Sequence, residues 1–278
     1  MTIPAFVPDQ AFGNLDRPKP QAVREVDPEI ISLPSLLGRD LEPPRWIIDK
    51  ILPEGLAMVV SPPKTGKSFL VGAVAIAAAS GGIAFNALRG FQCGVLFLDL
   101  EQSQFFAQAR WNQLLYGQTP PRDLRTAFRW NRMDRGGLQQ LERTLAKHPD
   151  IRLVIVDVLS QFWPMGGGSN RNANAYHVEY QILVQLRDFA EAHRIALLLV
   201  HHTNKTKGTD QLDRASGTNA MTGVPGASWD LSRERKAKTG KLYITGRSVV
   251  EMELEMVWNP FAGGWNVATQ TREEAMPV

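Results

Sequence analysis

The stretch Ser61-Pro-Pro-Lys-Thr-Gly-Lys-Ser68 is the part of this chain with the clearest chemistry. An apolar run, 56–60, precedes it and a second, 69–79, follows it, so we expect a strand, a tight loop and a helix. Backbone N–H groups of such a loop point inward, and the helix adds the positive end of its dipole. Lys67 can then reach β- and γ-phosphates, and the Ser68 hydroxyl can ligate Mg²⁺. The stretch therefore predicts a phosphate-binding loop.

This loop meets the pattern G-x-x-x-x-G-K-[ST] at every defined position except the first, where Ser61 replaces glycine. The alternative is a Gly/Pro turn that enters a helix and happens to contain a lysine, which the flanking strand and helix disfavour. The residues expected to surround the nucleotide phosphates are Ser61, Pro62, Pro63, Lys64, Thr65, Gly66, Lys67, Ser68 and Phe69.

Asp157 ends a third apolar strand, for which we expect residues 151–158. A carboxylate at a strand tip beside a phosphate loop holds Mg²⁺, usually through water. An ordinary strand-end turn or helix cap is the alternative. We expect Asp157 to be the second metal-associated residue, with Ser68.

Two further carboxylates, Asp99 and Glu101, stand at the end of the second strand, expected at 94–100. Ligands bind at the carboxyl ends of parallel strands. A carboxylate there can align or deprotonate a water that attacks the γ-phosphate. The alternation of side chains places both on one face, so either could do so, and Glu101 is favoured over Asp99.

His201 and His202 end the fourth strand, expected at 195–201. Adjacent side chains on a strand point to opposite faces, and Cys93 is the single cysteine, so a zinc site is disfavoured. A polar residue at this tip can hydrogen-bond the γ-phosphate and sense its loss. We expect His202 to be this sensor, against the alternative of a buried, hydrogen-bonded histidine.

Two loops rich in Gly, Asn and Ser, 165–174 and 203–221, follow the same strand tips. Basic residues on them could hold a nucleic-acid backbone through its phosphates. Solvated loops with incidental charge are the alternative. The candidate DNA-binding residues are Arg171, Lys205, Lys207 and Arg214.

The elements that must position these residues alternate between strands and helices. Besides the four strands, we expect helices at 67–80, 103–116, 135–147 and 173–193. The strands are continuous apolar runs, which is typical of a parallel sheet buried on both faces. Short strands at 241–245, 249–257 and 265–267 indicate antiparallel hairpins at one edge. The predicted fold class is α/β with a mostly parallel central sheet flanked by helices.

The expected domain is 43–268, between a proline-rich, flexible arm at 1–42 and a flexible tail at 269–278. Residues 46–52 are expected to form a short helix or an edge strand. With 44% apolar residues the chain can bury a full core, and its net charge of +3 is no strong nucleic-acid signature. We see no signal region and no membrane span, which predicts a cytoplasmic protein.

These landmarks, in this order, resemble the RecA-like fold, and specifically the RepA-type AAA-family ATPases of bacteria, plasmids and phages. The resemblance covers about residues 43–267. Its motifs are Ser-Pro-Pro-Lys-Thr-Gly-Lys-Ser (61–68), Leu-Phe-Leu-Asp-Leu-Glu (96–101), Leu-Val-Ile-Val-Asp (153–157), Leu-Leu-Val-His-His-Thr-Asn-Lys (198–205), Ala-Ser-Gly-Thr-Asn (215–219) and Thr-Gly-Arg-Ser (245–248).

The resemblance implies a role for each matching position. Lys67 and Ser68 match the loop lysine and the Mg²⁺ ligand, and Asp157, Glu101 and His202 match the second metal-associated carboxylate, the hydrolytic glutamate and the γ-phosphate sensor. The loops 165–174 and 203–221 occupy the places of two DNA-contacting loops. Relatives form rings or filaments with ATP between subunits, which makes Arg247 and Lys241 candidates for a basic residue that completes a neighbour's site.

Three positions depart from the family pattern. Ser61 replaces the first loop glycine or alanine, Ser248 stands where relatives often have Asp, and Gly226 stands where an acidic residue is common. The last two bear on the contact between subunits more than on the chemistry, so we expect hydrolysis to be retained.

Together these observations predict an Mg²⁺-dependent ATPase that acts on single-stranded DNA as a replicative helicase or recombination factor. The expected assembly is a homo-oligomeric ring, for which a hexamer is one candidate size. The alternative is an ATP-dependent switch that binds a protein partner, with the arm at 1–42 as a contact. A small-molecule kinase is less favoured, because the sequence offers no arginine-rich lid.

Overall fold

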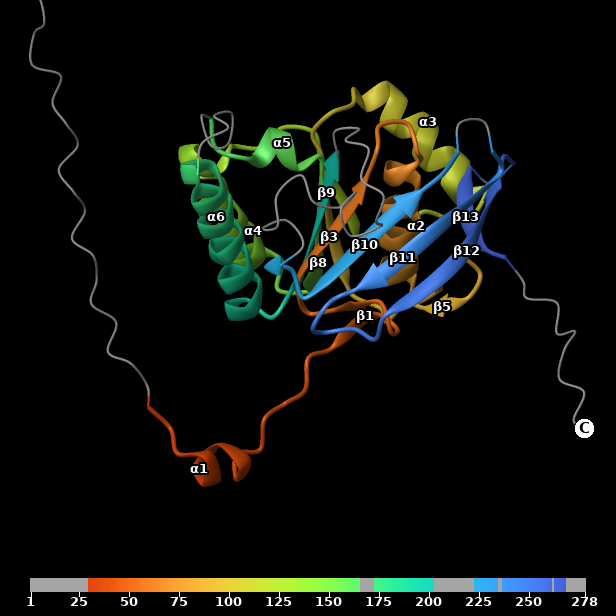
Figure 1. Ribbon diagram of the computed structural model, residues 1–278. Coiled ribbons are helices and arrows are strands. Elements are labelled where there is room, and N and C mark those ends of the chain that lie inside the picture. Colours follow the sequence, from red (N-terminus) through yellow and green to blue (C-terminus); the bar gives the residue numbers. More distant parts are fainter. Residues whose placement is uncertain (1–29, 166–172, 203–222, 235–236, 262, 269–278) are drawn as a thin grey trace, which may run out of the picture. The chain divides into compact units, whose positions relative to one another are not determined.

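The computed structural model describes residues 30–165, 173–202, 223–234, 237–261 and 263–268 (Figure 1). The chain divides into two compact units, 1–42 and 43–278. The described part of the first unit contains one short helix, α1 (Leu33–Leu37), whose N-cap Ser32 accepts a hydrogen bond from the Ser35 backbone N–H at 3.3 Å. The expected tail and most of the expected arm lie outside the described residues.

A large sheet with nine strands among the described residues forms the second unit, in the order β13-β12-β11-β10-β3-β9-β8-β6-β7 (Figure 1). Its strands from β10 to β7 are all parallel, and β11, β12 and β13 continue it as antiparallel neighbours. The parallel strands are β3 (Gly55–Ser61), β6 (Gly94–Asp99), β7 (Leu124–Ala127), β8 (Ile151–Asp157), β9 (Ala196–His202) and β10 (Ala227–Ser232). The antiparallel strands are β11 (Thr239–Thr245), β12 (Met252–Asn259) and β13 (Gly264–Val267). The predicted α/β class is confirmed.

Helices cover both faces of this sheet. On one face lie α2 (Lys67–Ser80) and α3 (Gln104–Leu115), and on the other lie α4 (Gly137–Lys147), α5 (Leu159–Phe162) and α6 (Ala173–Ala192) (Figure 1). The sheet has a hydrophobic core on each face. Neighbouring residues of β3 point into opposite cores, because Val59 packs with α2 and Met58 packs with α6. Burial on both faces is the reason the central strands are continuous apolar runs.

The sheet differs from the prediction at β10, which the sequence did not indicate. The antiparallel hairpins were expected at 241–245, 249–257 and 265–267, where β11, β12 and β13 lie, but Trp229 before them lies on a sixth parallel strand next to β3. Asp230 and Ser232 are only partly buried and alternate with apolar neighbours, so β10 lacks the continuous apolar run of the other parallel strands. The antiparallel strands are therefore confirmed, and what the prediction lacked at this edge is the parallel strand β10, with which β11 pairs.

Smaller elements were also absent from the prediction. At four residues, β7 is too short to show a periodic pattern. The segment 46–52 takes the strand alternative, because β1 (Trp46–Ile48) and β2 (Leu52–Pro53) pair as a separate hairpin. A second hairpin, β4 (Ile83–Ala84) with β5 (Leu88–Arg89), follows α2, and a 3₁₀ turn, Met133–Arg135, precedes α4.

The register of the parallel strands aligns their carboxyl ends along one edge. Ser61 of β3 pairs with His202 of β9, and Asp99 of β6 pairs with Asp157 of β8. The polar residues that the sequence places at four strand tips therefore meet at the same edge, where parallel sheets bind ligands.

Trp229 gives a test of the β10 placement. Its side chain is fully buried, and its indole Nε1–H donates to the Ile51 carbonyl at 3.1 Å. We expect Trp229→Ala to lower the free energy of unfolding by about 3–5 kcal/mol, because it leaves a large cavity and an unpaired carbonyl. The measurement is urea denaturation, with Phe261→Ala as control because Phe261 is 78% exposed. A loss below about 1 kcal/mol would contradict this placement.

Candidate nucleotide-binding site

The phosphate loop connects the end of β3 to the start of α2. Gly66 caps α2 with a φ of 100°, in the left-handed region that favours glycine. Thr65 Oγ1 donates to the Pro62 carbonyl at 2.8 Å, and the Ser61 and Thr65 hydroxyls hydrogen-bond each other. Ser61 is fully buried, so its hydroxyl is satisfied inside the loop. This bond is a physical reason why serine is accommodated where the pattern has glycine.

Lys67 directs its ammonium into the loop. Its Nζ donates to the Ser61 and Pro62 carbonyls, both at 2.8 Å, and the residue is 4% exposed. Burial lowers the pKa of Lys67 to about 8, while the charges of Asp157 and Glu101 act in the opposite direction. A phosphate anion would favour the protonated ammonium in the same way.

Aromatic side chains from the antiparallel strands pack beneath the loop. A Cβ added to Gly66 would lie 2.9 Å from Trp265 Nε1, and Phe69 packs edge-on against Trp258 at 5.2 Å between ring centroids. The Arg233 guanidinium lies over both tryptophan rings, at 5.4 and 5.2 Å from their centroids. Sequence reasoning missed this support because Arg233, Trp258 and Trp265 lie about 165 to 197 positions beyond the loop.

Asp157 lies beside Ser68, as the sequence predicted from the strand tip. The carboxylate is buried, which raises the pKa of Asp157, and a hydrogen bond from Ser68 and the charge of Arg110 oppose this rise. A hydroxyl and a carboxylate are hard oxygen donors, and Mg²⁺ binds through one or two carboxylates together with substrate phosphates. The two side chains therefore fit the donor set for Mg²⁺.

Asp99 forms a buried ion pair instead of reaching the site. Arg110 of α3 donates from Nη2 to Asp99 Oδ2 at 2.5 Å, and its Nη1 lies 3.9 Å from Asp157 Oδ2. The guanidinium also lies over the rings of Phe97 and Trp111, 5.6 Å from each centroid. Burial raises the pKa of Asp99 to about 6, although Arg110 acts to lower it. Nothing in the sequence pattern had singled out Arg110.

Glu101 and His202 lie together at the edge of the site. His202 Nε2 is 3.4 Å from Glu101 Oε2, and the Glu101 side chain is 55% exposed, whereas that of Asp99 is 1% exposed. Of the two carboxylates at this end of β6, only Glu101 therefore has access to a solvent water. Burial lowers the pKa of neighbouring His201 to about 4, with His202 and Lys67 adding to this effect. Among the described residues, no group of three or more His, Cys, Asp or Glu could hold a metal ion.

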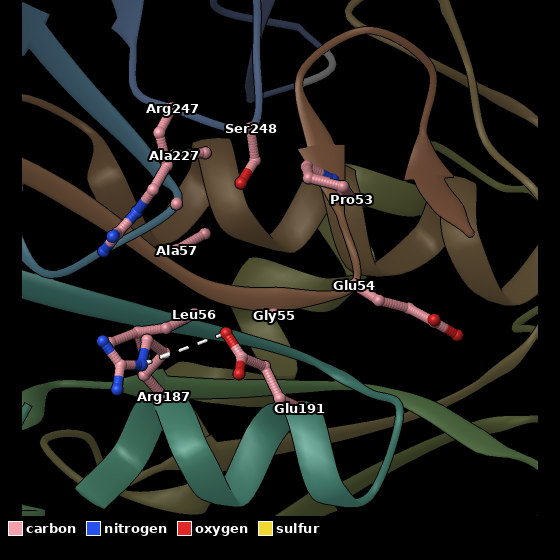
Figure 2. A pocket seen from close by; sticks show the side chains of 11 residues that line it. Pro53, Glu54, Gly55, Leu56, Ala57, Arg187, Glu191, Ala227, Arg247 and Ser248 are labelled. Atoms are coloured by element: carbon pink, nitrogen blue, oxygen red, sulfur yellow. Dashed lines mark ion pairs between the residues drawn. The ribbon is translucent and has the colours of Figure 1, made fainter. Parts of the chain in front are cut away.

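Arg247 lies at the other end of the sheet from the phosphate loop of its own chain. It follows β11, where Thr245 pairs with Ser228 at the start of β10, and its Nη2 donates to the Val224 carbonyl. It lines a pocket of about 320 Å³ with Arg187 and Glu191 of α6 (Figure 2). Within one chain the structure therefore does not bring Arg247 to Lys67.

Lys241 is engaged in ion pairs on the antiparallel strands. Its Nζ lies 2.6 Å from Glu253 Oε1 and 3.3 Å from Glu255 Oε1, and these carboxylates raise the pKa of Lys241. This lysine is less available than Arg247 for a neighbouring subunit. The four candidate DNA-binding residues, Arg171, Lys205, Lys207 and Arg214, lie outside the described residues.

Two of the positions that depart from the family pattern contact each other. Ser248 donates its backbone N–H to the Gly226 carbonyl at 3.0 Å, and a Cβ on Gly226 would lie 2.6 Å from Ser248 Oγ. The absence of a side chain at one position therefore makes room for the residue at the other.

A family model described as an AAA domain matches residues 27–208. The chain belongs to this family of AAA-type P-loop ATPases, which supports nucleotide binding and hydrolysis as its general activity. The match includes the phosphate loop, Glu101, Asp157 and His202, and it ends before β10 and Arg247. Comparison with curated proteins gave no match. In the described part of the chain, no helix is long and apolar enough to cross a membrane.

The Asp99–Arg110 pair predicts a pH effect on stability. Since the pKa of Asp99 rises from 3.8 to about 6 on folding, the folded protein binds an extra proton between these values. With respect to Asp99, the free energy of unfolding is therefore highest below pH 3.8, and it falls as pH rises from 3.8 to about 6 and the buried carboxyl ionises. Asp99→Asn cannot ionise, so the unfolding free energy of the variant relative to wild type should increase from pH 4 to pH 7, on the order of 2 kcal/mol.

Urea denaturation at several pH values measures this difference. The control is Asp150→Asn, because Asp150 is 43% exposed and pairs with Arg125 at the surface. A difference between Asp99→Asn and wild type that does not change across this pH range would contradict the raised pKa.

Proposed function

We propose that this protein is an Mg²⁺-dependent ATPase that assembles as a homo-oligomer and acts on single-stranded DNA, as a replicative helicase or a recombination factor. One observation carries the catalytic part: Lys67, Ser68, Asp157, Glu101 and His202 come from four separate strand ends and converge on one edge of the sheet. Membership of an AAA-domain family supports the same activity at its general level.

In this proposal each side chain acts on a stated part of the reaction. Lys67 and the loop N–H groups stabilise the negative charge on the β- and γ-phosphates, and Glu101 orients the water for in-line attack. His202, in contact with Glu101 at 3.4 Å, hydrogen-bonds the γ-phosphate and links its loss to the water-positioning carboxylate. Ser68 and Asp157 would hold Mg²⁺, which supplies neutralising charge when bound.

The position of Arg247 supports assembly. This residue lies at the opposite end of the sheet from the phosphate loop of its own chain, so it could act only on the site of a neighbouring subunit. A residue at the amino ends of the strands can reach the carboxyl-end site of a neighbour packed head to tail. A trans-acting arginine would stabilise the charge that develops on the γ-phosphate. The proposed assembly is a closed ring, with a hexamer as the form that the family resemblance implies.

The proposed DNA contact rests on the position of two loops in the sequence. Residues 165–174 follow β8 and α5, and residues 203–221 follow β9 directly, so both begin at the edge that carries the site. Phosphate contacts from Arg171, Lys205, Lys207 and Arg214 would make binding dependent on salt concentration.

A protein-binding switch is the second candidate, and the described part of the first unit favours it. Five apolar side chains are exposed there: Ile30 by 90%, Leu33 by 65%, Leu36 by 43%, Leu37 by 77% and Leu41 by 64%. Exposed apolar residues that are close in sequence are typical of a protein-binding segment. An ATPase rate that does not respond to single-stranded DNA would favour this switch over the DNA-dependent motor.

Lys67 and Lys147 form a matched pair for testing the site. Lys67 is buried within the phosphate loop, whereas Lys147 is exposed at the end of α4, outside the site. We expect Lys67→Ala to reduce kcat for ATP hydrolysis by about 10²–10³-fold, because a preorganised cation is lost from the developing charge. Lys147→Ala should stay within about threefold of wild type, since its loss removes no buried charge.

Phosphate release at saturating ATP and Mg²⁺ measures both rates. Normal turnover by the Lys67→Ala protein would contradict the assignment of the site, whatever the outcome for DNA.

Mixing two inactive proteins tests the trans role of Arg247. A Lys67→Ala subunit keeps Arg247 for its neighbour, and an Arg247→Ala subunit keeps an intact loop. We expect each protein alone to be nearly inactive, and an equal mixture that exchanges subunits to recover roughly a quarter of the wild-type rate, since half the intact loops then face an intact arginine. An Arg122→Ala protein serves as control, because Arg122 is exposed.

The mixture is measured at a protein concentration that supports assembly, established from its mass with a non-hydrolysable ATP analogue. If the equal mixture is no more active than its components, Arg247 does not act on a neighbour.

A further inference from the structure

The outer edge of the sheet next to β7 carries a surface that the ATPase site does not use. In the strand order β7 is the last strand, at the opposite edge from β13. The chain leaves β7 through the sequence Phe-Arg-Trp-Asn-Arg-Met-Asp-Arg (128–135), in which basic and aromatic residues alternate closely. This composition is typical of nucleic-acid contacts and had not been singled out from the sequence.

Three arginines from this segment line one pocket of about 320 Å³, which we call the arginine pocket. Arg129, Arg132 and Arg135 share it with Phe128 and Trp130. No carboxylate is among the described residues that line it. The pocket therefore presents concentrated positive charge beside aromatic surface.

The framework of this pocket is held by hydrogen bonds. Arg132 Nη1 donates to the carbonyls of Ser160 and Trp163, both at 2.8 Å. The nearby carboxylate of Asp134 accepts the Met165 backbone N–H at 3.1 Å, and Trp130 Nε1 donates to a backbone carbonyl. Arg132 therefore stabilises the framework of the pocket. The carboxylate of Asp134, the acidic residue closest in sequence, is already hydrogen-bonded to Met165.

Arg129 and Arg135 are exposed and remain available for a ligand. Among the described residues neither forms an ion pair with a carboxylate, and the contact of Arg135 is with Met165 Sδ at 3.7 Å. Two guanidinium groups beside a fixed third one suit the oxygen atoms of phosphate groups.

A second hollow of about 570 Å³, the aromatic groove, continues from the arginine pocket through their shared residue Phe128. It lies between α3 and β7, and Phe105 and Trp111 of α3 line it. The Phe105 side chain is 73% exposed. Amides of Gln104, Gln108 and Asn112 also line this groove, again without a carboxylate among its described residues.

Single-stranded nucleic acid combines the features that these two hollows match. Its phosphates pair with arginine, its bases stack on aromatic rings, and base edges hydrogen-bond to amides. An apolar helix would leave the arginines without partners, and an inorganic anion would not use the aromatic groove. We propose that the arginine pocket and the aromatic groove form a binding site for single-stranded nucleic acid, with Arg129 and Arg135 on phosphates and Phe105 and Phe128 against bases.

The arginine pocket also touches the ATPase site through one residue. Leu100 lines the pocket and lies between buried Asp99 and exposed Glu101, and its backbone N–H donates to the Asp157 carbonyl at 2.7 Å. A strand bound in the pocket would contact the residue next to the proposed water-positioning carboxylate. Occupancy of this site can therefore influence hydrolysis by a short path.

Fluorescence anisotropy with labelled oligo(dT) and oligo(U) tests the site without nucleotide. The double variant Arg129→Ala/Arg135→Ala should bind about tenfold more weakly at low salt, and the slope of log K against log salt should fall by roughly 1.4, for two lost phosphate contacts. The control is Arg122→Ala/Arg143→Ala, which removes two exposed arginines outside both hollows and should change affinity less than twofold.

Phe105→Ala tests the aromatic groove separately, because this exposed residue can be truncated without loss of core packing. The expected loss of affinity is about 5- to 150-fold, the range found when one base–aromatic stack is removed. Cross-linking of a bromouracil-substituted strand should label peptides that contain 104–112 or 128–135. The ATPase rate without oligonucleotide should match wild type, which shows that each variant is folded.

The outcomes separate this inference from the proposed function. If the oligonucleotides bind and the Arg129→Ala/Arg135→Ala and Phe105→Ala proteins retain wild-type affinity and salt slope, the site at β7 is overturned while DNA binding by the loops stands. If wild type binds neither oligonucleotide, the site and the DNA part of the proposed function fail together, and the Lys67 test still decides the ATPase.

Discussion

Two carboxylates and one guanidinium hold the strands together at the carboxyl-end edge of this sheet. Asp99 and Asp157 are register partners on neighbouring strands, so their like charges lie side by side in the interior. Buried charges persist only when they are paired, and Arg110 of α3 supplies the cation to both. Arg110 thereby connects α3 to the ends of β6 and β8, beside the Ser68 hydroxyl that hydrogen-bonds Asp157.

This arrangement also separates the tasks of the carboxylates. The cation neutralises Asp99 and leaves it a structural partner, whereas Glu101 stays exposed beside His202. Asp157 lies between these extremes, because it is buried, touches the guanidinium at 3.9 Å and still faces Ser68. Three acidic residues within reach of one loop therefore differ in burial and in the groups that they contact, and that difference allows them different roles.

The elements that could be predicted from sequence are those that local pattern determines. The bounds of α2 match the prediction because the loop and the apolar run after it fix both of its ends, and the four apolar strands place Asp157 and His202 correctly at strand tips. By contrast, β10 has a mixed pattern, and its parallel partner β3 lies about 170 residues earlier. Arg110 and Trp265 were equally hidden, since an arginine on a helix and a tryptophan on an edge strand have no pattern that shows what they will contact after folding.

The tryptophans beneath Gly66 set a lower limit on the piece of chain that can work alone. The family match ends at residue 208, before the strands that carry Trp258 and Trp265. A fragment trimmed to that match would keep the recognisable motifs but would lose the surface on which its loop rests. It would also leave β3 as an open sheet edge, a common cause of aggregation. In this protein the unit of sequence recognition is therefore smaller than the unit of folding.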